Sequence, residues 1–303
     1  MTKSTTYYSN GKLLLTGEYV VLDGADALAI PTKLGQNLKV SIVDTPGLHW
    51  KSFTNKNQCW FEAFFVLSTL ESTSTDPVAK TLTAILKSAR SLNSSFLIDN
   101  IGFEVRTTLD FDRSWGLGSS STLINSIASW AGVDAFTLLE KSFGGSGYDI
   151  AAAQNNTPII YTKRKKSVDI RNVFLDWDFK DSIYFVHLNK KQDSKEGIST
   201  YRTKPKDLKV IEAISAITNK LLMCYTLKDF ETLMQAHETH ISKLTGLATT
   251  KSRLFSDYPH TIKSLGAWGG DFILVVSPNQ NLEYFRNKGY TTIIPFNEMI
   301  LNK

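Results

Sequence analysis

The chain has 303 residues, of which 42% are hydrophobic and 21% are charged, and its formal net charge is +5. This composition excludes a disordered or repeat protein, and the length favours two domains. The mild positive charge suits a small anionic substrate, whereas the sequence has neither Lys/Arg-rich tails nor zinc-finger spacing, so we expect no nucleic-acid partner.

Cysteine usage and hydropathy predict where the protein works. Cys59 and Cys224 are far apart in the sequence, which fits a reducing compartment with unpaired thiols. The first ten residues are polar and lack the apolar segment of a signal peptide. Apolar runs fall short of the roughly 18 to 20 residues that cross a bilayer. We therefore expect a cytoplasmic protein without a membrane partner.

The first segment with a chemical pattern is residues 12 to 23, which predict a strand, a turn at Gly17 and a second strand. Lys12 stands at the head of the first strand. A Walker A motif is excluded here, because Leu13 occupies the position where that motif needs Ser or Thr. Hydrophobic periodicity further predicts strands at 36 to 43 and 96 to 108 and a helix over 77 to 92.

A loop rich in glycine and serine then runs directly into a predicted helix. Gly116 and Gly118 permit positive φ and a close approach of the backbone to a ligand. Unpaired N–H groups at the following helix N-terminus favour a phosphate. Leu123 and Ile127 recur at helical spacing, and Gly132 stands where a glycine ends a helix. The segment fits a phosphate-binding loop and equally fits a flexible loop before an ordinary capped helix.

A second glycine-rich turn precedes Asp149 at the start of another predicted helix. An Asp at this position commonly caps its own helix. The same position keeps a carboxylate ionised, as a general base or a positioning group requires. From these residues alone, both interpretations stay open.

The second half of the chain has a different element pattern, so we place a domain boundary near residue 160. The basic run Lys163 to Lys166 predicts a solvated hairpin. Strands mixed with amphipathic helices favour an α+β, ferredoxin-like second domain. His237 and His240 are three residues apart, whereas a zinc-binding H-E-x-x-H helix needs four, so no metal site is predicted there. The predicted elements are a strand at 183 to 188, helices at about 206 to 225 and 228 to 244, a strand pair within 262 to 277, a helix at 281 to 288 and a strand at 290 to 295.

Taken in order, four segments of the chain resemble the GHMP kinases, the family named after galactokinase, homoserine kinase, mevalonate kinase and phosphomevalonate kinase. Gly11 to Gly24 is similar to the family's first motif, and Gly116 to Ser121 is similar to its second. Gly145 to Asp149 resembles the segment with the catalytic aspartate, and Gly266 to Asp271 resembles the third motif. Together they span nearly the whole chain.

This resemblance implies an α+β, two-domain GHMP kinase fold. The N-terminal ATP-binding domain, residues 1 to 160, would resemble ribosomal protein S5 domain 2. Residues 161 to 303 would form a ferredoxin-like C-terminal domain. The resemblance also implies a kinase that depends on ATP and Mg²⁺, as a monomer or a homodimer.

The resemblance also assigns roles to individual residues. Asp149 would take or orient the proton of the substrate hydroxyl, and Lys12 would keep that carboxylate ionised and steady the transferred phosphoryl group. Ser120 and Glu140 are the candidate magnesium ligands, although Glu140 lies about a helical turn nearer the aspartate than the family's glutamate. The ATP phosphates would be held by Gly116, Leu117, Gly118, Ser119, Ser120 and Ser121. The substrate and phosphate loop would comprise Gly266, Ala267, Gly269, Gly270 and Asp271.

Two residues depart from the family pattern, since Asn10 replaces a proline and Trp268 replaces a glycine. The first motif lacks the Gly-Glu-His-Thr-Asp of galactokinases, which favours 5-phosphomevalonate or mevalonate as acceptor, in isoprenoid precursor synthesis. Two alternatives stay open: a non-catalytic nucleotide-binding relative, and an enzyme like diphosphomevalonate decarboxylase, against which Lys12 argues. Cations available to a phosphorylated acceptor are Arg113, Lys190, Lys191 and Lys195.

Overall fold

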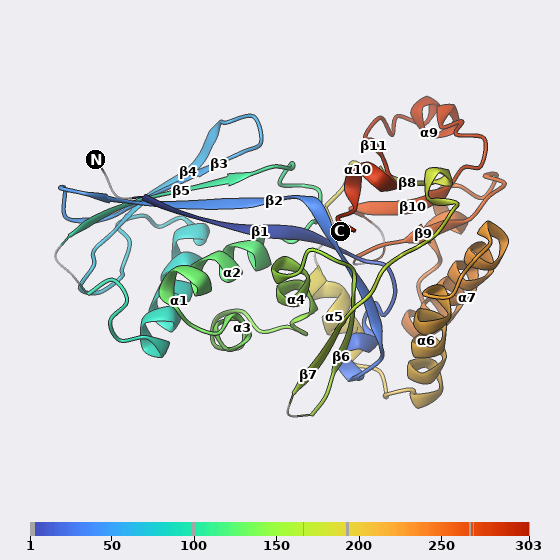
Figure 1. Cartoon of the computed structure of the whole chain (residues 1–303), viewed down its shortest axis with the longest axis horizontal. Helices are drawn as coiled ribbons and strands as arrows, with labels where there is room; N and C mark the ends of the chain where they lie inside the picture. The colour runs from blue at the N-terminus through green and yellow to red at the C-terminus, as the bar shows by residue number, and fades with distance from the viewer. Residues whose placement is uncertain are drawn as a thin grey trace. The chain divides into compact units, whose positions relative to one another are not determined.

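The computed structural model describes residues 4–98, 101–165, 167–191, 194–266, 268 and 270–302. The chain divides into two compact units that interleave along the sequence (Figure 1). Unit 1 comprises Met1–Gly11, Leu34–Arg113 and Gly118–Gln154, and unit 2 comprises Lys12–Lys33, Ser114–Leu117 and Asn155–Lys303. The compact units therefore do not follow a single cut near residue 160. The assignment of residues 1 to 160 and 161 to 303 to two functional domains stays a prediction.

Unit 1 is a mixed sheet with helices packed on one side, as Figure 1 shows. Its strands lie in the order β4-β3-β5-β2. The β3–β5 pair is parallel, whereas β3–β4 and β2–β5 are antiparallel. The strands are β2 (Ala27–Val43), β3 (Gly47–Phe53), β4 (Cys59–Phe65) and β5 (Gly102–Leu109), and the helices are α1 (Pro77–Leu92), α2 (Ser119–Ala131), α3 (Ala135–Ser142) and α4 (Tyr148–Gln154).

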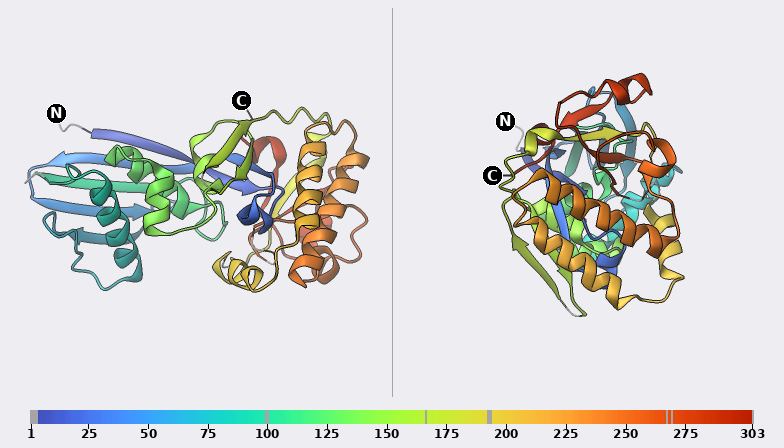
Figure 2. Two further views of the ribbon diagram at one scale, coloured as in Figure 1. Left: turned by 90° about the horizontal axis from the view of Figure 1, so that it is seen from below. Right: turned by 90° about the vertical axis from the view of Figure 1, so that its right-hand side faces the viewer.

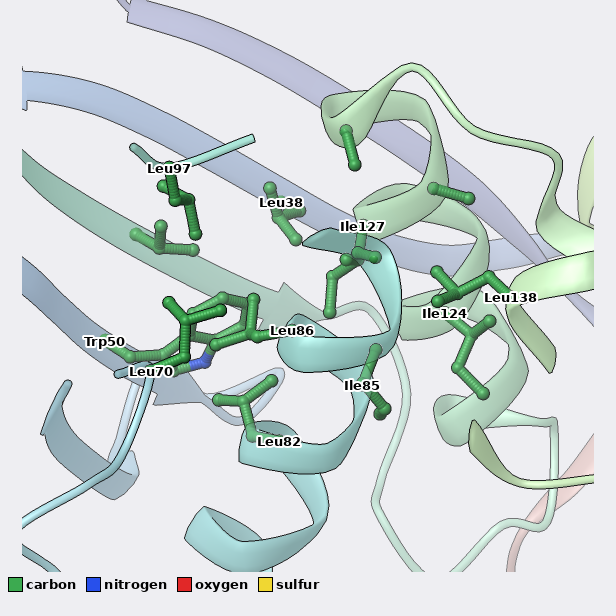
Figure 3. Close-up of a cluster of buried hydrophobic side chains, with 14 of the residues drawn as sticks. Leu38, Trp50, Leu70, Leu82, Ile85, Leu86, Leu97, Ile124, Ile127 and Leu138 are labelled. Atoms are coloured by element: carbon green, nitrogen blue, oxygen red, sulfur yellow. The ribbon is translucent and has the colours of Figure 1, made fainter. Parts of the chain in front are cut away.

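Local sequence signals explain these helices. Asp76 caps α1 by accepting the N–H of Val78 at 2.7 Å, and Pro77 occupies the first turn, where its missing N–H has no effect. The apolar positions of α1 and α2 face the sheet and form the unit's core (Figure 3). The labelled side chains are Leu38, Trp50, Leu70, Leu82, Ile85, Leu86, Leu97, Ile124, Ile127 and Leu138.

Unit 2 contains a four-stranded antiparallel sheet in the order β11-β8-β10-β9. Along the chain, helices connect β8 to β9 and β10 to β11, so this is the β-α-β-β-α-β arrangement of a ferredoxin-like domain. The ferredoxin-like prediction is confirmed. The strands are β8 (Ile183–His187), β9 (Ile262–Ser264), β10 (Phe272–Val276) and β11 (Ile293–Pro295), and the helices are α5 (Ser194–Arg202), α6 (Leu208–Leu221), α7 (Leu227–Thr245), α8 (Thr250–Leu254), α9 (Glu283–Asn287) and α10 (Phe296–Met299).

Unit 2 also contains the N-terminal part of β2, which pairs through Ala27–Ala29 with β6 (Ile159–Lys163). Strand β6 pairs in turn with β7 (Val168–Asn172), so the hairpin predicted around the basic run is confirmed. Helices α6 and α7 lie side by side, as Figure 2 shows. Within the described ranges, no helix combines the length and apolar character needed to cross a bilayer.

The second strand predicted within 12 to 23 is wrong. β1 (Ser4–Leu14) is followed by a 3-10 helix, Val20–Asp23. Gly24 takes a left-handed conformation and its N–H bonds to the carbonyls of Val20 and Val21, which closes a turn instead of extending a strand. The strand predicted from residue 96 begins only at Gly102, and β3, β4, α5, α8 and α10 were not predicted.

Candidate active site

In unit 1, the N-terminus of α2 has no side-chain cap. Its N-cap is Gly118, which adopts a left-handed conformation with φ of 88°. The serines do not cap the helix, and the Thr122 hydroxyl donates to Gln36 Oε1 at 2.7 Å. Because the first backbone N–H groups of a helix have no intrahelical acceptor, this uncapped terminus is suited to an anion. Ser120 is exposed on its first turn.

Within unit 1, Asn125 of α2 is hydrogen-bonded both to β1 and to α4. The Asn125 amide donates to Ser9 Oγ at 2.9 Å, and Gln154 of α4 donates to Asn125 Oδ1 at 2.9 Å. Asp149 lies in the first turn of α4, half-buried. Asp149 is therefore on an element that packs against α2 and is linked to it by the side-chain hydrogen bond from Gln154 to Asn125.

The predicted magnesium ligands both belong to unit 1. Glu140 is exposed in the last turn of α3, and Ser120 is exposed at the start of α2. In the part of the chain that is described, no group of three or more His, Cys, Asp or Glu side chains could hold a metal ion.

In unit 2, Lys12 contacts the second motif at two points. Its backbone N–H donates to the Leu117 carbonyl at 3.0 Å, and its Nζ donates to the Gly116 carbonyl at 3.3 Å. The structure thus brings the lysine of the first motif and the first glycine of the second motif together. Lys12 and Asp149 belong to different units.

Asp271 of the third motif lies against the same glycine. A Cβ atom on Gly116 would be 2.3 Å from Asp271 Cγ, and Gly116 has φ of 66°. The backbone of Asp271 is fixed by two hydrogen bonds: its N–H donates to the Lys190 carbonyl at 2.6 Å, and its carbonyl accepts from Leu188 N–H at 2.8 Å. A side chain at position 116 would force the Asp271 carboxylate to move and would strain the backbone, because φ is positive there.

Aromatic contacts anchor the remainder of this loop in unit 2. The Trp115 ring packs edge-on against Phe272 of β10, with a centroid distance of 5.4 Å. His187 of β8 lies beside the preceding residue of the loop, with its Nε2 3.3 Å from the Ser114 carbonyl oxygen. Residues Ser114–Leu117 are therefore held by the ferredoxin-like sheet.

Trp268 occupies a backbone position that suits glycine. Its φ is 51°, in the left-handed region, and the side chain is 5% exposed. Its indole Nε1 has no hydrogen-bond partner among the described residues. A bulky residue at positive φ is strained. Gly266 also has positive φ, at 64°, and Gly270 is buried; the predicted site residues Ala267 and Gly269 lie outside the described residues.

Of the predicted cations, Arg113 places its guanidinium over the Trp60 ring in unit 1, 3.4 Å from the centroid. Lys190 and Lys191 are exposed in unit 2, and the side chain of Lys195 lies outside the described part.

Sequence reasoning missed a buried charged cluster in unit 2, formed by Glu18, His237, Glu238 and Lys263. A signal was present, because His237 falls on the apolar face of α7 with Phe230, Met234 and Ile241. A histidine followed by a glutamate at core positions of an amphipathic helix indicates buried polar partners.

Comparison with protein-family models and with curated protein sequences gives no match. Solved structures do match over nearly the whole chain. The Methanococcus jannaschii mevalonate kinase has a TM-score of 0.71 and 14% identity, covering 96% of this chain and 96% of that one. The Streptococcus pneumoniae phosphomevalonate kinase, in complex with phosphomevalonate and AMPPNP, has a TM-score of 0.69 and 14% identity, covering 94% and 95%. The Lactococcus lactis galactokinase, complexed with galactose, has a TM-score of 0.73 and 13% identity, covering 99% and 94%.

These likenesses define the class of fold. The chain has the α+β fold of the GHMP kinases, and the resemblance inferred from its motifs is confirmed at the level of the fold.

Proposed function

We propose that this protein is an ATP-dependent kinase of the GHMP family that phosphorylates a small anionic acceptor. The observation that carries the proposal is the meeting of three motifs in unit 2, where Lys12 Nζ and the Asp271 carboxylate both lie against Gly116. A glycine loop held by a lysine and followed by an uncapped helix N-terminus is suited to the phosphates of a nucleotide.

The chemistry needs few groups, because phosphoryl transfer depends on positioning and charge neutralisation. An acceptor oxygen forms the new bond to the γ-phosphorus, and the bond from that phosphorus to the bridging oxygen breaks to release ADP. Where the acceptor oxygen is a hydroxyl, as in mevalonate, Asp149 takes or orients its proton; a phosphate oxygen, as in 5-phosphomevalonate, attacks in its ionised form and needs no proton acceptor.

Lys12 supplies a positive charge beside the glycine loop and steadies the transferred phosphoryl group. The N–H groups of Ser119, Ser120 and Ser121 at the start of α2 bind phosphate oxygens. Mg²⁺, when bound, neutralises charge on the phosphates. Ser120 and Glu140 are the residues of this chain proposed to hold it.

For the acceptor, we propose mevalonate or 5-phosphomevalonate. The fold alone does not separate these from a sugar, since a galactokinase matches as well as the two mevalonate-pathway kinases. The first motif favours the branched acids, because it reads Gly-Glu-Tyr where galactokinases have Gly-Glu-His-Thr-Asp.

The direct test is a coupled assay of ADP release with ATP, Mg²⁺ and mevalonate, 5-phosphomevalonate or galactose. We expect turnover of one of the two acids. With mevalonate, whose acceptor group is a hydroxyl, Asp149→Asn should lower kcat by about 10² to 10⁴, because it removes the proton acceptor. Asp134→Asn is the matched control: Asp134 also stands at a helix start in unit 1, where it caps α3, and Asn caps equally well.

A loss of less than about threefold in Asp149→Asn would contradict the role of the carboxylate. Binding of an ATP analogue without turnover of any acceptor would favour a non-catalytic relative, which the strained Trp268 in the third motif makes the second candidate. Release of CO₂ from diphosphomevalonate would instead identify a decarboxylase.

A further inference from the structure

Four ionisable side chains form a buried cluster in unit 2, apart from the groups assigned to phosphoryl transfer. Glu18 is 1% exposed, His237 and Lys263 are fully buried, and Glu238 is 4% exposed. A charge removed from water is strongly destabilising unless it is paired and hydrogen-bonded. The buried charges of this cluster therefore have to balance one another.

Lys263 is the cation at the centre of the cluster. Its Nζ donates to Glu18 Oε1 at 2.5 Å and to the Ser264 carbonyl at 2.8 Å, and lies 3.6 Å from Glu238 Oε1. Ser264 Oγ donates to Glu238 Oε2 at 2.9 Å. With both carboxylates ionised, the ammonium leaves one buried negative charge without compensation.

The second oxygen of Glu18 faces a histidine that is already an acceptor. The Gly17 N–H donates to His237 Nε2 at 3.1 Å, so this nitrogen carries a lone pair and the ring is neutral. Glu18 Oε2 lies 3.2 Å from the same Nε2. Two acceptors at this distance repel each other, whereas a proton on Oε2 makes one of them a donor and removes the excess charge.

The surroundings favour that proton. Burial raises the pKa of Glu18 to about 7, and the Lys263 ammonium offsets only part of this effect. Burial, followed by the charges of Lys263 and His240, holds the pKa of His237 well below its usual range. The other titratable groups that face the pair are Glu238, whose pKa burial raises, and the Tyr19 phenol, whose pKa burial raises to about 12.

We propose that Glu18 and His237 share one buried proton. With this proton in place, Glu18 and His237 act as positioning residues that hold the first and third motifs together for the reaction. Glu18 follows Lys12 in the first motif, and Lys263 precedes Gly266 in the third. The cluster thus links the first motif, the third motif and α7, and the first and third motifs are two of the three segments that meet at Gly116. The kinetic consequence rests on the proposed function, whereas the shared proton does not.

The sign of the pH dependence follows from the two pKa directions. The pKa of the Glu18 carboxyl is raised from 4.5 to about 7, so the stability that its proton contributes is lost as pH rises through about 7. The pKa of His237 is lowered from 6.5, so the stability that the neutral ring contributes is lost as pH falls. Between pH 4.5 and 6.5, Glu18 and His237 together bind one proton in the folded state and one in the unfolded state, so their joint contribution to stability is nearly constant. It decreases only between pH 6.5 and about 7.

Glu18→Gln is the decisive variant, because its amide can donate to His237 Nε2 while its oxygen accepts from Lys263. In the wild type we expect kcat/KM for ADP release to fall with rising pH, with a midpoint near 7. Over about pH 6 to 9, Glu18→Gln should be flat within about twofold. The matched control is Glu238→Gln, which changes a buried glutamate of the same cluster that contacts Lys263 and Ser264. It should still titrate, with a midpoint at lower pH than the wild type, because the charge of Glu238 helps to raise the pKa of Glu18. The wild-type midpoint retained in Glu18→Gln would overturn the proposal.

A measurement on the wild type covers the case in which Glu18→Gln does not fold. The ¹⁵N signals of the five histidines are followed against pH, with His237 assigned from His237→Gln. We expect a ring that stays neutral, protonated on Nδ1, and an Nε2 signal that shifts with a midpoint near 7. An Nε2 signal unchanged through that range overturns the shared proton even if the enzyme turns over. A titrating signal without turnover contradicts the proposed function and supports the shared proton.

Discussion

At the scale of single residues, Gly116 is the position on which the candidate site depends most. Lys12 Nζ bonds to its carbonyl, and the Asp271 carboxylate fills the space where its side chain would be. Both neighbours come from distant parts of the sequence, so the restriction at this position arises from tertiary contacts. The sequence motif alone indicated only that the backbone here was free to take positive φ.

Gly116→Ala should therefore lower stability by more than about 1 kcal/mol and abolish binding of an ATP analogue, because it adds a collision to left-handed strain. The matched control is Gly144→Ala in unit 1: Gly144 has a similar φ of 71°, and a Cβ there meets nothing within 4 Å. It should show the strain alone. Urea unfolding and calorimetric titration measure both effects. Since Asp271 is the colliding group, adding Asp271→Ala to Gly116→Ala should recover part of the stability, and equal losses in the two glycine variants would refute the collision.

At the scale of elements, local signals predicted the ends of the longer helices well. The helix over 77 to 92 is confirmed at both ends, because Asp76 and Pro77 mark its start and Asn93 closes it. The end of α2 at Gly132 is confirmed for a similar reason. By contrast, β3 and β4 were not predicted, because their stability comes from pairing with each other and with β5. The cluster around Lys263 was missed because Glu18 is more than 200 residues away in sequence from its partners His237 and Lys263.

Helix α7 carries two members of that cluster, and its cap offers a test of how much a local signal contributes. Thr226 accepts the Asp229 N–H at 3.1 Å at the start of this helix. Thr226→Ala should lower the free energy of unfolding by about 1 kcal/mol. Thr239→Ala is the control, since Thr239 is exposed within the same helix and its hydroxyl donates to the Gln235 carbonyl; we expect a change within about 0.5 kcal/mol. Urea unfolding followed by circular dichroism compares them, and equal changes would argue against the cap.

At the scale of the whole molecule, the compact units interleave, so neither is a continuous stretch of sequence. Lys12–Lys33 belongs to unit 2 and supplies much of its interior. Leu15 and Leu28 from this segment are buried, and Thr16 Oγ1 is hydrogen-bonded to Thr218 at 2.7 Å. Glu18 from the same segment is the partner of Lys263. A sequence cut at residue 160 separates these groups from the sheet that they complete.

This arrangement predicts that residues 155–303 do not fold alone. Without Glu18, the Lys263 ammonium loses its 2.5 Å partner, and removing one partner of a buried pair is strongly destabilising, by about 3 to 5 kcal/mol. The exposed apolar surface left by Leu15 and Leu28 adds to that loss. The fragment should show no cooperative urea transition and poorly dispersed amide resonances. The control is the same fragment with residues 12–33 joined through a flexible Gly/Ser linker, which should recover a cooperative transition because it restores the partners of Lys263 and Thr218. A fragment that unfolds as cooperatively without the added segment as with it would show that the ferredoxin-like sheet is stable by itself, and that the buried cluster serves the motifs and not the fold.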